Sequence, residues 1–82
     1  MIEYIAEALE WYDKTYGNPY SSVRVISTQT GKVVKVYPFQ YGRADNYRLL
    51  FMRDNGLDYS QVKLCSSAAK KREAEAWGKL DI

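Results

Sequence analysis

Short turn-forming sequences divide this chain into segments, and they limit the folds open to it more than any other feature. Gly17-Asn18-Pro19 joins a residue suited to a left-handed cap with one that cannot extend a helix. Thr30-Gly31 lies between two β-branched runs, and Asn55-Gly56 follows a leucine-rich segment. At 82 residues, with no linker between the segments, residues 1–82 are expected to form a single domain.

The first segment, residues 2–16, is predicted to be a helix. Its large apolar residues recur at spacings of three and four and fall on one stripe: Ile2, Ile5, Leu9, Tyr12 and Tyr16. Glu3 and Glu7 suit the positive end of a helix dipole. Gly17 is then expected to end the helix.

The segments 22–28 and 32–37 are predicted to form a β-hairpin, because both are rich in β-branched residues. A two-residue loop at Thr30-Gly31 pairs Val25 with Val36 on an apolar face. A slip of one residue would place Lys35 opposite Val25 and make that face polar. The two-residue loop is therefore the favoured register.

The second half of the chain contains weaker signals. Pro38 ends the second strand or marks it as an edge strand, and residues 39–43 read as a loop. Residues 44–53 are predicted to be a helix that Asn55-Gly56 ends, with a strand over 47–52 as the alternative. Residues around Val62 and Leu64 alternate like a short strand. A last helix over 68–77 follows, with Ser66 or Ser67 as its N-cap.

These elements predict an α+β fold in the order α-β-β-α-β-α. The expected sheet is short and antiparallel, a hairpin plus one strand, and two or three helices pack on one of its faces. We expect a domain of modest stability, because a chain of this length buries only roughly 60–65% of its unfolded surface.

The cysteine and histidine content limits the classes of function that are open to this chain. Cys65 is the single cysteine and histidine is absent, so no internal disulfide forms and a cytoplasmic location is expected. Common zinc sites and histidine-dependent catalysis are excluded. We expect no enzyme activity, metal or cofactor. The N-terminal segment carries acids and no apolar run approaches membrane length, so neither a signal peptide nor a membrane partner is expected.

Positive charge is concentrated in the middle of the chain. Ten of the twelve lysines and arginines lie within residues 24–72, against three acids. Aromatic residues are interleaved with these cations. A cationic surface that carries aromatic rings is one way in which proteins hold an RNA or DNA strand.

The candidate binding residues fall into three groups. The outer face of the hairpin provides Arg24, Lys32, Lys35 and Tyr37. The loop after the hairpin provides Tyr41 and Arg43. The start of the last helix provides Lys70, Lys71 and Arg72. The two tyrosines are expected to stack on bases and the cations to bind phosphates. The first and third groups also have a structural interpretation, in which Tyr37 packs under a helix and the Lys70–Arg72 cluster is a solvated helix face.

The end of the chain resembles the double-stranded-RNA-binding domain. In that family a helix precedes three strands, and a Lys-Lys pair opens the final helix. The likeness rests on Ser67-Ala68-Ala69-Lys70-Lys71, and it implies that Lys70 and Lys71 contact phosphates across the RNA major groove. The segment 43–58 has no counterpart in the family unless residues 47–52 are its third strand.

The whole chain also looks like a small accessory protein of T4-like phages, with segments 8–14 and 37–42 carrying the likeness. This resemblance implies an inhibitor of a host defence factor, such as an endoribonuclease toxin. Our prediction is a non-catalytic nucleic-acid-binding module, for RNA in preference to DNA, with this inhibitory role. The alternative is a module that inhibits a host protein by direct contact without nucleic acid.

Overall fold

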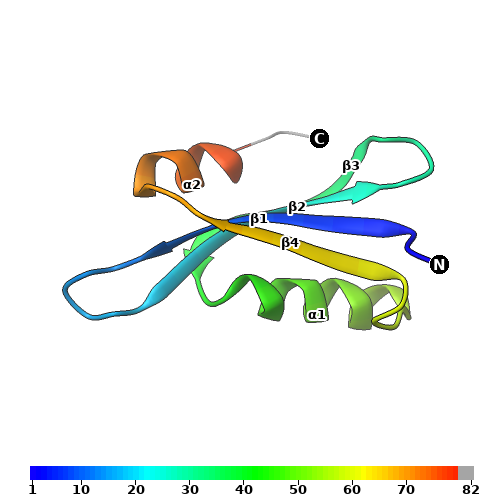
Figure 1. Cartoon of the computed structure of the whole chain (residues 1–82), viewed down its shortest axis with the longest axis horizontal. Coiled ribbons are helices and arrows are strands. Elements are labelled where there is room, and N and C mark those ends of the chain that lie inside the picture. Colours follow the sequence, from blue (N-terminus) through cyan, green and yellow to red (C-terminus); the bar gives the residue numbers. More distant parts are fainter. Residues whose placement is uncertain (80–82) are drawn as a thin grey trace.

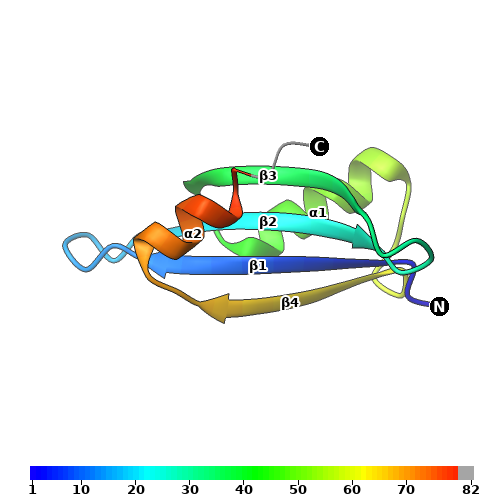
Figure 2. The ribbon, with the colours of Figure 1, turned by 90° about the horizontal axis from the view of Figure 1, so that it is seen from above.

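The structure, a computed structural model, describes residues 1–79 as one four-stranded sheet with a helix on each face. In chain order the elements are β1 (Tyr4–Tyr12), β2 (Pro19–Ser27), β3 (Val33–Tyr41), α1 (Ala44–Asn55), β4 (Val62–Ala68) and α2 (Lys71–Trp77). The strands lie in the order β3-β2-β1-β4. The first three form an antiparallel meander, and β4 runs parallel to β1 (Figure 2).

Three parts of the predicted fold are wrong, although the α+β class holds. The observed order is β-β-β-α-β-α, and the sheet is mixed because β4 pairs in parallel with β1. The helices also do not share a face. Figure 1 shows α1 below the sheet and α2 above it, and the two faces are named below after the helix that each carries. Neither helix within residues 1–79 has the length and apolarity needed to cross a membrane.

The predicted first helix is strand β1, at the centre of the sheet between β2 and β4. Because protein covers both faces of a central strand, apolar residues occur at odd and at even positions along it. Ala6 and Ala8 are buried on the α1 face, while Ile5, Leu9 and Trp11 alternate onto the α2 face. Apolar residues on both faces produced the three-and-four spacing that imitated a helix.

The hairpin of β2 and β3 is present, but its register differs from the prediction. Val25 lies opposite Lys35 and Val23 opposite Tyr37, which is the slip that the sequence argument rejected. The predicted register holds only where a buried residue of one strand pairs with a buried residue of the other. Because β3 is an edge strand, Lys35 reaches solvent at its rim, while Tyr37 is buried beneath α1.

Pro38 lies within an edge strand, as one of the two predicted alternatives required. Strand β3 continues past Pro38 to Tyr41, so residues 39–41 belong to the strand and not to the predicted loop over 39–43. The register shifts between Ser21 and Val23, so that Pro38 and Phe39 together oppose Ser22. This β-bulge turns Phe39 and Tyr41 onto the α2 face, away from the α1 face that holds Tyr37.

Helix α1 confirms the predicted helix and excludes the strand alternative. Its C-cap is Gly56, which has φ 64°, and the Leu57 N–H donates to the Met52 carbonyl at 2.8 Å. Phe51 and Met52 are buried against the sheet, where the core also includes Val23 and Val62. The main core therefore lies between α1 and the sheet.

The predicted strand around Val62 and the predicted last helix are both present, but their bounds differ from the prediction. Ser66 and Ser67, the predicted N-caps, lie within β4, because the pairing with β1 continues to Ala68. Helix α2 begins at Lys71, and its N-cap Lys70 makes no side-chain capping hydrogen bond. The Ser22 hydroxyl donates to the Ala74 carbonyl, which anchors α2 on β2.

The buried tyrosine of β3 predicts a loss of stability in alkali. Burial raises the pKa of Tyr37 above its ordinary value of 10.0, and the charge of Asp54 adds to the shift. The protonated phenol is therefore favoured in the folded state, and its contribution is complete below pH 10 and is lost as the pH rises through the folded pKa.

We expect the free energy of unfolding to fall more steeply above pH 10 in the wild type than in Tyr37→Phe. Urea denaturation across that pH range measures this difference. Tyr47→Phe is the related variant, because burial also raises the pKa of the neighbouring Tyr47. Equal slopes for the wild type and Tyr37→Phe would contradict the assignment.

Candidate nucleic-acid interface

A row of aromatic side chains crosses three strands at one end of the sheet. Trp11 of β1 pairs in register with Tyr20 of β2, which in turn pairs with Tyr41 of β3. The ring centroids of Trp11 and Tyr20 are 5.6 Å apart, and those of Tyr20 and Tyr41 are 5.8 Å apart. Phe39 stacks on Tyr20 at 5.5 Å. We call Trp11, Tyr20, Phe39 and Tyr41 the aromatic row.

Solvent reaches the aromatic row unequally. Tyr41 is 62% exposed at the edge of the sheet, and Trp11, Tyr20 and Phe39 are half-buried beside α2. The row therefore has a structural part, where the inner rings support α2, and an accessible part at Tyr41. An exposed ring backed by packed rings is held in place, which suits it to stacking on a planar ligand.

Cations lie at the β1 end of the aromatic row. The Lys71 ammonium is 5.4 Å from the centre of the Trp11 ring. A groove of about 570 Å³ separates the end of β1 from the connection between β4 and α2. Its lining includes the exposed Lys14, Lys70 and Lys71, together with Glu10 and Glu73. Arg72 follows on α2 and is exposed as well.

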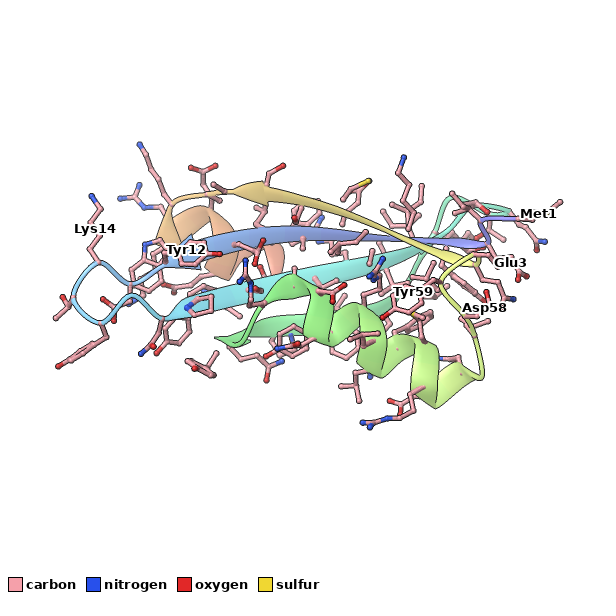
Figure 3. The ribbon with its side chains drawn as sticks, turned by 60° about the horizontal axis from the view of Figure 1, so that its bottom comes forward. Met1, Glu3, Tyr12, Lys14, Asp58 and Tyr59 are labelled. Carbon is pink, nitrogen blue, oxygen red and sulfur yellow. The ribbon has the colours of Figure 1, made fainter. Side chains whose placement is uncertain are left out.

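A further cation is fixed at the same end of the molecule by Tyr12. The Arg43 guanidinium donates to the Tyr12 hydroxyl at 3.3 Å, which ties the start of α1 to the end of β1. Figure 3 shows Tyr12 and Lys14 at the end of the molecule opposite Asp58 and Tyr59. Within residues 1–79 the one ion pair is Arg48–Asp45. The cations near the aromatic row thus have no carboxylate of the described chain within ion-pair distance.

The fold brings five of the nine candidate residues to this end of the sheet, four on the α2 side and Arg43 on the α1 side. They are Tyr41, Arg43, Lys70, Lys71 and Arg72. The predicted hairpin patch, in contrast, is divided between the two faces of the sheet. Lys32 lies in the turn between β2 and β3, at the other end of the sheet (Figure 2). Lys35 lies on the α1 face beside Tyr37.

Two residues of the hairpin patch have structural roles instead. Tyr37 is only 6% exposed and packs against Tyr47 of α1, so its ring is not available to stack on a base. Arg24 lies on the α2 face, where its guanidinium carbon is 3.8 Å from the centre of the Trp77 ring. Its Nε also donates to the Trp77 carbonyl at 2.9 Å. Arg24 therefore holds the end of α2 in place.

Trp11 and Tyr20 belong to the site, and the sequence argument missed both. Trp11 had been assigned to a helix, and Tyr20 had been placed before the predicted hairpin. A usable signal exists in the sequence, because a short loop that contains Gly17, in the structure residues 14–17, can close a β-hairpin as well as stop a helix. A strand on each side of that turn brings Trp11 and Tyr20 opposite each other.

Comparison of the chain with protein-family models, with curated proteins and with solved structures found no significant match. The resemblance to the double-stranded-RNA-binding domain requires a helix at the start of the chain, where the structure has β1. Any function must therefore be argued from the surface itself.

Proposed function

We propose that this protein is a non-catalytic RNA-binding module that holds a single strand against the aromatic row. The observation that carries the proposal is the continuous path of contacts from Lys71 through Trp11 and Tyr20 to the exposed ring of Tyr41. Rings that stack on bases and cations that contact phosphates are the two components of single-strand binding. Here both lie at the same end of one sheet.

Each component has a defined part in the proposed complex. Tyr41 provides the accessible ring on which a base stacks, and the inner rings fix its position. Lys70 and Lys71 border the groove at the other end of the row, where a phosphate would meet two cations that form no ion pair within residues 1–79. Stacking favours single strands, because bases within a duplex have no free face. The bound strand would run across β1, β2 and β3.

Salt dependence tests the phosphate contacts. We expect the affinity for a fluorescently labelled single-stranded RNA, measured by anisotropy, to fall as salt rises. Each phosphate contact contributes roughly 0.7 to the slope of log K against log salt for single strands. The double variant Lys70→Ala/Lys71→Ala should therefore flatten the slope by about 1.4. Lys32→Ala/Lys63→Ala removes the same charge elsewhere and should leave most of the slope.

A pair of equally exposed tyrosines tests the stacking contact. Tyr41→Ala should weaken RNA binding by roughly 5- to 150-fold, because stacking contributes about 1–3 kcal/mol per base. Tyr59 is the matched control, since it is 61% exposed against 62% for Tyr41 and lies at the other end of the molecule (Figure 3). Tyr59→Ala should leave the affinity unchanged. Absence of RNA binding at low salt, or equal effects of the two variants, would refute the proposal.

A second candidate function, binding of a host protein by direct contact, is favoured by a surface on the α1 side that shares Tyr41 with the proposed RNA site. A groove of about 620 Å³ beside α1 is lined mainly by apolar side chains, including Leu49, Leu50 and Leu57. Binding through this groove should depend little on salt and survive nuclease treatment of a host lysate. The inhibitory role toward a host nuclease stays a prediction under either function, because no described contact bears on it.

A further inference from the structure

The two edges of the sheet differ in how well they are protected from pairing with another strand. Edge strand β3 contains Pro38 and two register shifts, which are features that block pairing. Edge strand β4 has neither proline nor a register shift in its seven residues, and Lys63 is its one charged residue. Residues 65–68 are exposed, and Figure 2 shows no element beyond this edge. An unprotected edge of this kind is a template for a further strand.

The hydrogen bonds to β1 show which backbone groups of β4 are free. The Gln61 carbonyl accepts from the Tyr4 N–H at 3.0 Å, and the Ala69 N–H donates to the Glu10 carbonyl at 2.9 Å. Because backbone groups alternate along a strand, the odd-numbered residues of β4 face β1. The N–H and C=O groups of Val62, Leu64, Ser66 and Ala68 therefore point away from the sheet.

We propose that β4 pairs in antiparallel fashion with β4 of a second copy of this chain, which joins two sheets into one of eight strands. The register that pairs all seven residues has its two-fold axis at Cys65. Outward-facing Leu64 then lies opposite the second copy's Ser66, and Val62 opposite its Ala68. Cys65 faces Cys65 in a position without direct hydrogen bonds, where side chains are closest.

Charge complementarity favours a second antiparallel copy over other occupants of this edge. The exposed Asp58 precedes β4, and Lys70 and Lys71 follow it. Antiparallel pairing brings the cationic end of each copy to the Asp58 end of the other, and this contact occurs twice. Lys63 lies opposite the uncharged Ser67, so no like charges meet across the new ladder. The strand pairing itself uses the backbone of β4, whereas the flanking Lys70 and Lys71 also belong to the proposed RNA site, so self-association is tested on RNA-free protein.

Self-association of the RNA-free protein tests this proposal. Sedimentation equilibrium should show a monomer–dimer equilibrium in reducing buffer. Mild oxidation should then give a Cys65–Cys65 dimer, because non-hydrogen-bonded pairs have the Cα separation that a disulfide requires. Ser67→Lys should weaken the dimer by about tenfold, since it places like charges opposite each other at two symmetric positions. Adding Lys63→Glu to this variant should restore dimerisation.

Two control variants distinguish the proposed pairing of β4 with β4 from general effects of added charge or lost stability. Thr28→Lys adds the same charge at an exposed turn and should leave the dimer intact. Ser66→Pro removes an outward-facing N–H while keeping the bonds to β1, and it should abolish dimerisation with little change in the circular dichroism spectrum. A protein that stays monomeric at all concentrations overturns the proposal. So does a dimer that Ser67→Lys and Ser66→Pro leave unchanged.

Discussion

Phe51→Ala is expected to lower the free energy of unfolding by about 3–5 kcal/mol, the usual range for removing a buried phenylalanine. Phe51 is 5% exposed on the inner side of α1, and its ring meets Tyr4 edge to face with centroids 5.2 Å apart. It thus joins α1 to the central strand of the sheet. For a domain of this size the loss is comparable with the whole stability, so most of the chain should unfold near room temperature.

Urea denaturation followed by circular dichroism measures this effect. Leu49→Ala is the control on the same helix, because Leu49 is 36% exposed and should lose at most about 1 kcal/mol. Phe51→Leu keeps most of the apolar volume and should retain a measurable unfolding transition if Phe51→Ala does not. Equal losses for Phe51→Ala and Leu49→Ala would show that α1 is not held to the sheet by this side chain.

The part of the fold that local signals control was predictable from the sequence. Asn55-Gly56 ended α1 as expected, since a left-handed cap depends on the residue at that position alone. The alternation around Val62 also gave β4 correctly. The incorrect predictions are those for β1 and for the hairpin register. Both features depend on which elements cover each face of a strand. Ala6 is buried because α1 covers it, and no feature within residues 2–16 reveals that helix.

The candidate site shows the same division between local and non-local information. Lys70, Lys71 and Arg72 are adjacent in the chain, so the sequence alone identified them as a cluster. The aromatic row depends instead on strand pairing and on the bulge at Pro38, which turns Tyr41 away from the face that holds Tyr37. Without the bulge, Tyr37 and Tyr41 would share a face. The sequence interpretation instead placed Tyr41 in a loop after the hairpin and grouped it with Tyr37 as a second stacking ring, and the structure separates a core tyrosine from a surface one.

The close contact between the end of α2 and β3 gives the second large prediction. A Cβ added at Gly78 would lie 2.7 Å from the Phe39 backbone nitrogen and 2.9 Å from the Pro38 Cα. Both are backbone atoms of the bulge and cannot rotate away. Gly78 has φ −84°, a value that any residue adopts, so the effect of a substitution is steric and not conformational.

We expect Gly78→Ala to lower the free energy of unfolding by about 1–3 kcal/mol, the range for overpacking, and to displace the end of α2 from the sheet. Trp77 would lose its stacking with Arg24 and the hydrogen bond from its indole N–H to the Glu7 carbonyl, 2.9 Å in the wild type. Tryptophan emission in a Trp11→Phe background reports this change as a shift to longer wavelength.

Gly56→Ala separates steric displacement from a general loss of stability. Nothing lies within 4 Å of a Cβ at Gly56, and its φ of 64° strains an alanine at the end of α1 only. This variant should lose about 1 kcal/mol with Trp77 emission unchanged. If Gly78→Ala left the Trp77 emission as it is in the wild type, α2 would not be held by its contact with the bulge. The position of Lys70 and Lys71 beside the aromatic row would then need another cause.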